Sequence, residues 1–179
     1  PEDMRGEGFR NIVNLMGDIY YHSGLYEQAR DVYRSLYDQY VQENNWVFYR
    51  PFVMMNNLGQ ICLKTGNIEK AGSWFRLSLE RAEKYLHTPY RINTIAYIRL
   101  KLAETALRTD DLKGAEAFLQ DVAAYPADMI QDDVWLDHLW QQACFLYKKG
   151  NYEASFLKLN EIIKTETAAA SVQTFVPEI

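Results

Sequence analysis

Apolar residues recur along most of the chain at intervals of three and four positions, and each such run ends at a short polar turn. This spacing places apolar side chains on one face of a helix. The pattern therefore predicts an all-α chain without β-strands. The predicted helices cover about 5–23, 26–44, 48–65, 68–86, 90–109, 112–124, 132–148 and 151–166.

One pattern of small and apolar residues occurs four times in register. Residues 17–33, 59–75, 103–119 and 143–159 align without gaps, and the segments begin 42, 44 and 40 residues apart. Small residues occupy the first position of every segment and a second position later in it. They are Gly17, Gly59, Ala103 and Ala143, and then Ala29, Ala71, Ala115 and Ser155. Periods of this length indicate a repeat architecture.

A turn signal lies between the two small positions of each segment. The four turns are Ser23-Gly24, Thr65-Gly66-Asn67, Thr109-Asp110-Asp111 and Lys149-Gly150-Asn151. Gly and Asn adopt the left-handed conformation that ends a helix, and Asp and Asn cap the helix that follows. Each segment is therefore predicted to be a pair of antiparallel helices, whose backbones approach closely at the small residues.

This pattern resembles the tetratricopeptide repeat, whose motif places small, aromatic and turn residues at fixed offsets. The matching residues are Met16-Gly17, Tyr20, Gly24, Tyr26, Ala29 and Tyr33 in the first segment, and Leu58-Gly59, Gly66, Ala71 and Phe75 in the second. The later segments depart from the motif, with Asp110 in place of the turn Gly and Ser155 in place of the central Ala. The resemblance covers roughly residues 10–163 and implies a right-handed α-α superhelix, a solenoid of four helical hairpins.

The period of about 42 residues exceeds the 34 residues of the common tetratricopeptide repeat by about two helical turns. Long repeats of this type resemble those of kinesin light chains, the spindle-orientation adaptor LGN, the Rap phosphatases and MalT-like regulators. The pattern predicts a solenoid over residues 1–167 and a C-terminal tail at 168–179, which is either poorly ordered or docked on the solenoid as an extended peptide. The predicted repeats are 10–45, 46–88, 89–129 and 130–166.

Composition narrows the classes of function. The 179 residues carry a net charge of −5, and no predicted helix face gathers Lys and Arg, so nucleic-acid binding through phosphates is not expected. No apolar run is long enough to cross a membrane. Cys62 and Cys144 lie far apart in apolar helical contexts. We expect them to be buried thiols, which fits a reducing compartment and a cytoplasmic location.

The sequence carries no catalytic motif of the common kinds. It has no P-loop, dinucleotide-binding fingerprint, HExxH or GxSxG, so we expect neither enzymatic activity nor a cofactor. Asp133, Asp137 and His138 share a predicted helix at a spacing that suits a metal ion. Acidic residues near a helix start are also favoured by the helix dipole, and no further ligand cluster accompanies them, so no metal site is expected.

The resemblance implies where a partner would bind, because the first helix of each tetratricopeptide repeat lines the concave face of the superhelix. Matching to the motif predicts the groove residues Asn14, Asp18, Tyr21, Asn56, Asn57, Gln60, Tyr97, Lys101, Glu104, Asp137 and Trp140. Asn14 and Asn56 occupy one repeat position, and an amide there can hold a peptide backbone as both donor and acceptor. The acidic members outnumber Lys101, which predicts a mildly acidic groove.

One specific tetratricopeptide function is not expected. Co-chaperones that hold C-terminal carboxylates use a clamp of Lys, Asn, Asn, Lys and Arg. Only Asn57 and Lys101 match that clamp here, and Asp18 would repel a carboxylate.

Two functions remain open at this point. The first is a protein-protein interaction scaffold that binds a peptide or helix of a partner on its concave face. The second is a ligand- or peptide-sensing region of a larger signalling or transcription-regulatory protein. The partner of the scaffold is a protein or peptide, and the sensing region binds a peptide or a small ligand. Self-association through the terminal repeats or the tail is a further expectation.

Overall fold

The computed structural model describes residues 2–43, 50–87 and 90–173. This part of the chain is entirely helical apart from turns, as the hydrophobic pattern predicted. Eight α-helices and one short 3-10 helix, η1, occur in these ranges. They are α1 (Glu2–His22), α2 (Tyr26–Gln42), α3 (Arg50–Lys64), α4 (Ile68–Tyr85), α5 (Arg91–Arg108), α6 (Leu112–Ala123), η1 (Ala127–Met129), α7 (Asp132–Lys148) and α8 (Tyr152–Gln173).

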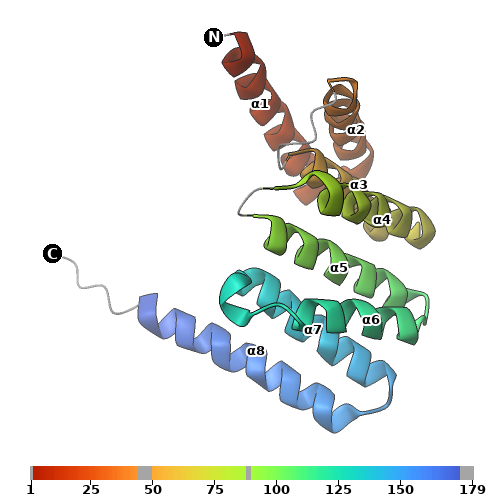
Figure 1. Ribbon diagram of the computed structural model, residues 1–179, viewed down its shortest axis with the longest axis vertical. Helices are drawn as coiled ribbons and strands as arrows, with labels where there is room; N and C mark the ends of the chain where they lie inside the picture. Colours follow the sequence, from red (N-terminus) through yellow and green to blue (C-terminus); the bar gives the residue numbers. More distant parts are fainter. Residues whose placement is uncertain (1, 44–49, 88–89, 174–179) are drawn as a thin grey trace, which may run out of the picture.

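The helices stack in chain order as four antiparallel hairpins (Figure 1). Each helix packs against the next, and the first helices α3, α5 and α7 also contact one another in sequence. Three clusters of buried side chains follow the stack from α1–α3 through α3–α5 to α5–α7. The fold is therefore an all-α helical-repeat superhelix.

The turns inside the hairpins have the backbone conformation that the sequence predicted. Gly24, Gly66 and Gly150 have positive φ angles of 76°, 79° and 77°, and Asp110 takes the equivalent position with φ 59°. The following helices are capped in three of the four hairpins by the side chains of Asn67, Asp111 and Asn151. In the first hairpin Leu25 occupies the cap position and makes no such bond.

The small residues lie where two helices cross at close range. A Cβ added to Gly17 would lie 2.6 Å from Cε1 of Tyr33. Ala29, Ala71 and Ala115 have no exposed surface. These contacts confirm why each hairpin needs small side chains at the two repeat positions.

The element boundaries differ from the prediction mainly at the ends. α1 begins at Glu2, and α8 continues to Gln173 instead of ending near residue 166. The first part of the predicted tail is therefore helical, which contradicts an extended peptide over 168–173; residues 174–179 lie outside the described ranges. Within those ranges, no helix has the length and apolar character needed to cross a membrane.

Candidate functional site

The first helices of the hairpins form a surface with two adjoining hollows. A central hollow of about 340 Å³ lies over α1, α3 and α5, and a C-terminal hollow of about 480 Å³ lies over α5 and α7. Lys101, Glu104 and Arg108 line both of them. The two hollows are therefore continuous, and together they are called the first-helix groove.

Most of the residues predicted for partner binding lie on this groove. The central hollow is lined by Asp18, Tyr21, Asn57, Gln60, Tyr97, Lys101 and Glu104. The C-terminal hollow adds Asp137 and Trp140. Asn14 lies one turn before Asp18 and donates Nδ2 to its carboxylate at 3.2 Å, so it positions a groove residue. Asn56 lies elsewhere, in a separate pocket.

Hydrogen bonds between helices hold the groove side chains in place. The hydroxyl of Tyr33 on α2 donates to Oδ1 of Asp18 at 2.6 Å. Burial raises the pKa of Tyr33, and this hydrogen bond to Asp18 raises it further. Nε2 of Gln60 donates to the hydroxyl of Tyr97 at 3.1 Å, which links α3 to α5. The polar floor of the groove is thus preorganised.

Lys101 is the centre of a charge network between α5 and α7. Its Nζ donates to Oδ2 of Asp137 at 2.9 Å and lies 3.6 Å from Glu104. Burial alone lowers the pKa of Lys101, but the charge of Asp137, with Tyr97 and Glu104, outweighs burial and raises the pKa overall. Lys101 is therefore protonated, and its charge is neutralised inside the protein.

Aromatic side chains provide the apolar surface of the groove. Trp140 is 51% exposed in the C-terminal hollow, although Trp side chains are usually well buried. Tyr21 and Tyr97 are half-buried in the central hollow. Burial is the main cause that raises the pKa of Tyr21, so its hydroxyl stays protonated. These three rings can contact the side chains of a bound peptide.

A separate pocket of about 360 Å³ opens beside the groove and shares Tyr97 with it. We call it the amide pocket because three of its side chains are amides. Its lining is Asn56, Tyr90, Asn93, Thr94, Tyr97, Gln131, Asp133 and Val134. Asn56 is only 6% exposed, so the expectation that it clamps a peptide in the open groove is not met. The other residues that line the pocket come from α5, the start of α7 and the residues just before these helices.

One row of groove residues was missed in the sequence. The last turns of α1, α3, α5 and α7 carry a basic residue at one repeat position. They are His22, Lys64, Arg108 and Lys148, and all four line the groove. The alignment of the four segments contains this signal. The signal alone does not indicate a binding surface, because basic residues at helix C-termini are favoured by the helix dipole anyway.

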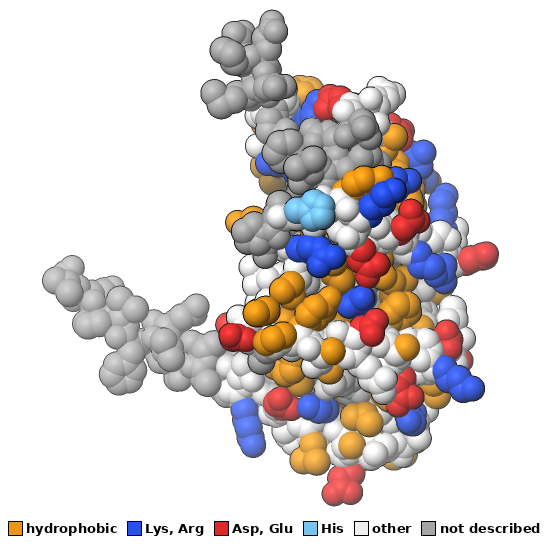
Figure 2. All heavy atoms as spheres, in the orientation of Figure 1, with side chains coloured by type: hydrophobic (Ala, Val, Ile, Leu, Met, Phe, Trp, Pro, Cys, Tyr) orange, Lys and Arg blue, Asp and Glu red, His pale blue; other side chains and the backbone are white. Residues whose placement is uncertain are grey.

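This row changes the expected charge of the groove. Its lining includes Lys64, Arg108 and Lys148 besides the residues already predicted, so it is mixed in charge and the mildly acidic groove is a wrong prediction. The face drawn in Figure 2 likewise shows Lys and Arg side chains interspersed with Asp and Glu, without a large area of one charge.

The structure does not bring the candidate metal ligands together, and the two cysteines are free thiols. Asp137 accepts hydrogen bonds from Lys101 and Gln141, and His138 is fully buried beside the ring of Trp135. In the described ranges no three His, Cys, Asp or Glu side chains converge as metal ligands would. Cys62 and Cys144 are free and partly buried, and burial raises the pKa of both thiols.

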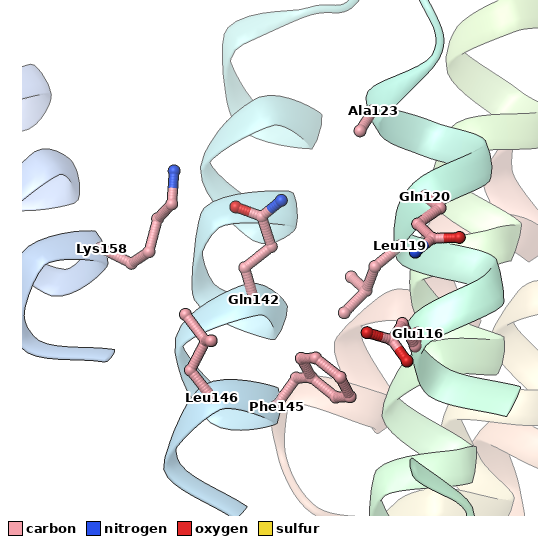
Figure 3. Close-up of a pocket in the computed structure, with 8 residues that line it drawn as sticks. All are labelled: Glu116, Leu119, Gln120, Ala123, Gln142, Phe145, Leu146 and Lys158. Atoms are coloured by element: carbon pink, nitrogen blue, oxygen red, sulfur yellow. The ribbon is translucent and has the colours of Figure 1, made fainter. Parts of the chain in front are cut away.

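A smaller apolar hollow of about 230 Å³ lies away from the groove, between α6 and α8. Figure 3 shows Leu119 extending from α6 and Phe145 and Leu146 from α7, with Lys158 on α8 beyond them. Few polar atoms face this space, so it offers no fixed hydrogen-bonding pattern for a specific ligand.

Comparison with known proteins finds a similarity to a repeat family in part of the chain. Residues 17–85 match the model of the tetratricopeptide repeat family. The structure is similar to BtubC (BKLC) from P. vanneervenii, with a TM-score of 0.71 and 12% sequence identity over 95% of this chain. This chain spans 66% of the length of that chain, and at this identity the likeness concerns the fold alone. No curated protein matches the sequence.

Proposed function

We propose that this chain, which carries tetratricopeptide repeats, is an interaction module whose first-helix groove binds a peptide segment of a partner protein. Tetratricopeptide repeats generally mediate protein–protein interaction. The proposal goes further, because it assigns the binding to one surface and to named residues.

The continuity of the groove is the observation that supports this proposal. The two hollows together cross α1, α3, α5 and α7, and they have three lining residues in common. Their polar side chains are already fixed by hydrogen bonds between helices, such as those of Gln60 and Lys101. A preorganised surface binds more tightly, because little side-chain entropy is lost on association.

The chemistry of the lining suggests the kind of segment that binds. The lining combines the exposed ring of Trp140, the half-buried rings of Tyr21 and Tyr97, and amide side chains. The acidic residue Asp137 is paired with Lys101, and Glu104 is paired with Lys101 and Arg108. An apolar side chain can pack on Trp140, while the amide of Asn57 can bond a peptide backbone. We expect a segment with apolar anchors and mixed charge, held without one dominant salt bridge.

Peptide selection tests the proposal. A random peptide library displayed on phage is selected on the intact chain, and the recovered peptides are titrated by calorimetry against variants. Trp140→Ala should weaken binding by about 2 kcal/mol or more if the ring is a binding anchor. Tyr97→Ala should also weaken it, since Tyr97 joins α3 to α5 at the centre of the groove.

Tyr147 provides a matched control. It is 64% exposed on α7, and its ring contacts that of Tyr152 outside the groove. Tyr147→Ala should leave the affinity unchanged. Peptides that bind all three variants as tightly as the native chain would refute binding in the first-helix groove.

A further inference from the structure

We infer that the amide pocket is a subsite for a cationic side chain, arginine or lysine, of the bound segment. This inference rests on the proposed function, because the pocket opens beside the first-helix groove and shares Tyr97 with it. It adds a chemical requirement that the groove itself does not impose.

The first observation is the unsatisfied amide of Asn56. The side chain is more than nine-tenths buried and lines the pocket, yet no described residue hydrogen-bonds its Oδ1. A buried polar atom without a partner lowers the stability of the fold, and such atoms are rare in folded proteins. An acceptor held in this state can be satisfied by a donor that enters the pocket.

The second observation is the charge of the pocket. Among the described residues that line the pocket, Asp133 is the only Asp, Glu, Lys, Arg or His, and it lies at the exposed start of α7. Its Oδ1 accepts the backbone N–H of Val134 at 2.9 Å, which leaves Oδ2 for another donor. A carboxylate and an amide oxygen together select a ligand that donates hydrogen bonds and carries positive charge.

The third observation is the shape and rigidity of the pocket. Tyr90 is 59% exposed and supplies an aromatic surface, which attracts guanidinium and ammonium groups. The ring of Tyr97 is already occupied by a cation, because Nζ of Lys101 lies 5.2 Å from its centroid. Asn93 bonds the backbone of Met129 and Gln131, so the segment before α7 is tied to α5. The volume is near the lower limit for small-ligand sites and suits a single side chain.

Nuclear magnetic resonance tests this inference with a pair of small probes. N-acetyl-L-argininamide and its neutral isostere N-acetyl-L-citrullinamide are titrated into the ¹⁵N-labelled chain. The arginine probe should shift the side-chain amide signals of Asn56, Asn93 and Gln131, and the citrulline probe should not. Asp133→Asn should weaken the binding of the arginine probe about threefold or more, as expected for the loss of a partly exposed ion pair.

Asp128→Asn is the matched control, because Asp128 is exposed in η1 and is not part of the pocket lining. It should leave the titration unchanged. Equal shifts from both probes, or none from the arginine probe, would overturn the subsite. If library peptides still bind the groove in that case, the proposed function stands without the subsite. The proposed function itself would fail if Trp140→Ala and Tyr97→Ala did not weaken the binding of those peptides.

A second inference rests on a different surface, the outer side of α1. Five large apolar side chains are exposed there: Phe9, Ile12, Leu15, Met16 and Ile19. We propose that a second copy of this chain covers this stripe by packing its α8 against it, so that the superhelix continues from one molecule to the next.

The repeat shows what such a stripe contacts. Ile12 and Met16 are 62% and 44% exposed, but the equivalent residues of α3 are Met54 and Leu58, which are 2% and 3% exposed. Those two side chains pack in one cluster with residues of α2, the second helix of the preceding hairpin. The stripe on α1 is therefore an unfilled copy of the interface between successive hairpins.

The outer side of α8 has the matching feature. Phe156 is 63% exposed and corresponds to Gly72 of α4, whose position faces Thr105 on the next first helix. An α8–α1 contact between two molecules thus reproduces the α4–α5 contact within one. Such a contact joins different surfaces and can add further molecules without closing.

Sedimentation velocity over a range of concentrations tests this second inference. The native chain should form species larger than a dimer, while Ile12→Glu and Phe156→Glu should each be monomeric. Mixing these two variants should give a dimer and nothing larger, because each retains one of the two faces. A native monomer at every concentration, or a dimer that survives Phe156→Glu, would overturn the α8–α1 contact.

Discussion

Gly59 lies against the ring of Phe75 so closely that an added Cβ would be 2.5 Å from Cε1 and 2.7 Å from Cζ. Phe75 has no exposed surface and belongs to the core cluster around α4, so its ring has no free space to enter. The same relation joins Gly17 to Tyr33 in the first hairpin. In the first two hairpins, the crossing of the two helices therefore depends on a glycine and an aromatic ring together.

Gly59→Ala should destabilise the fold by about 1–3 kcal/mol through overpacking against Phe75. Gly8→Ala is the control, because nothing lies within 4 Å of a Cβ at that position of α1. There the higher helix propensity of Ala should be neutral or add up to about 1 kcal/mol. Urea denaturation measures both, and equal effects of the two substitutions would show that the close contact does not exist.

Asp110 should be strained by its left-handed backbone, since its φ is 59° where the other three hairpins have glycine. Comparing Asp110→Gly with Asp110→Ala isolates this strain, because both variants lose the ion pair with Lys148. The glycine variant should be more stable by about 1 kcal/mol. At Lys113, an exposed helical position of α6, the order should reverse in favour of Ala. If thermal denaturation showed the Ala variant to be more stable than the Gly variant at both sites, the result would contradict backbone strain at Asp110.

His138 should make the stability fall in mildly acidic solution. Burial, with a smaller effect of the charge on Lys158, lowers the pKa of His138 to about 4, although Asp137 and Glu161 oppose the shift. The folded state thus holds the neutral ring, and its contribution is complete above the unfolded pKa of about 6.5. As pH falls below that value the unfolded state binds the proton first, so stability decreases.

The expected loss from His138 is about 1 kcal/mol between pH 7.5 and 5.5. His138→Phe should remove this part of the pH dependence in urea denaturation. Tyr147→Phe, at an exposed position of the same helix, serves as the control and should keep this pH dependence. A native chain whose stability is constant over this range would contradict the buried neutral histidine.

The hairpins could be predicted from the sequence because their determinants are local. Helical spacing of apolar residues, a left-handed turn residue and two small positions occur within each segment, so α4 and α6 were predicted within one residue of their observed ends. α8 was predicted to end too early, because its apolar pattern fades before its helix does.

The groove could be predicted only in part, because burial depends on neighbouring repeats. Trp140 and Tyr97 line the hollows on the first helices, where the motif predicts them, since their repeat positions determine their direction. Asn56 has the same repeat position as Asn14, yet it is buried and lines a separate pocket with residues of α5 and the start of α7. No sequence pattern close to Asn56 predicts its burial, because the other residues that line the pocket belong to the next two hairpins.

Photo-crosslinking tests the central claim, binding of a peptide in the first-helix groove, most directly. Benzoylphenylalanine is introduced at Trp140 in the groove or at Glu80 on the exposed side of α4, and a library-selected peptide is irradiated with each variant. The account predicts a covalent product from position 140 and none from position 80. A product from position 80 with none from position 140 would contradict it.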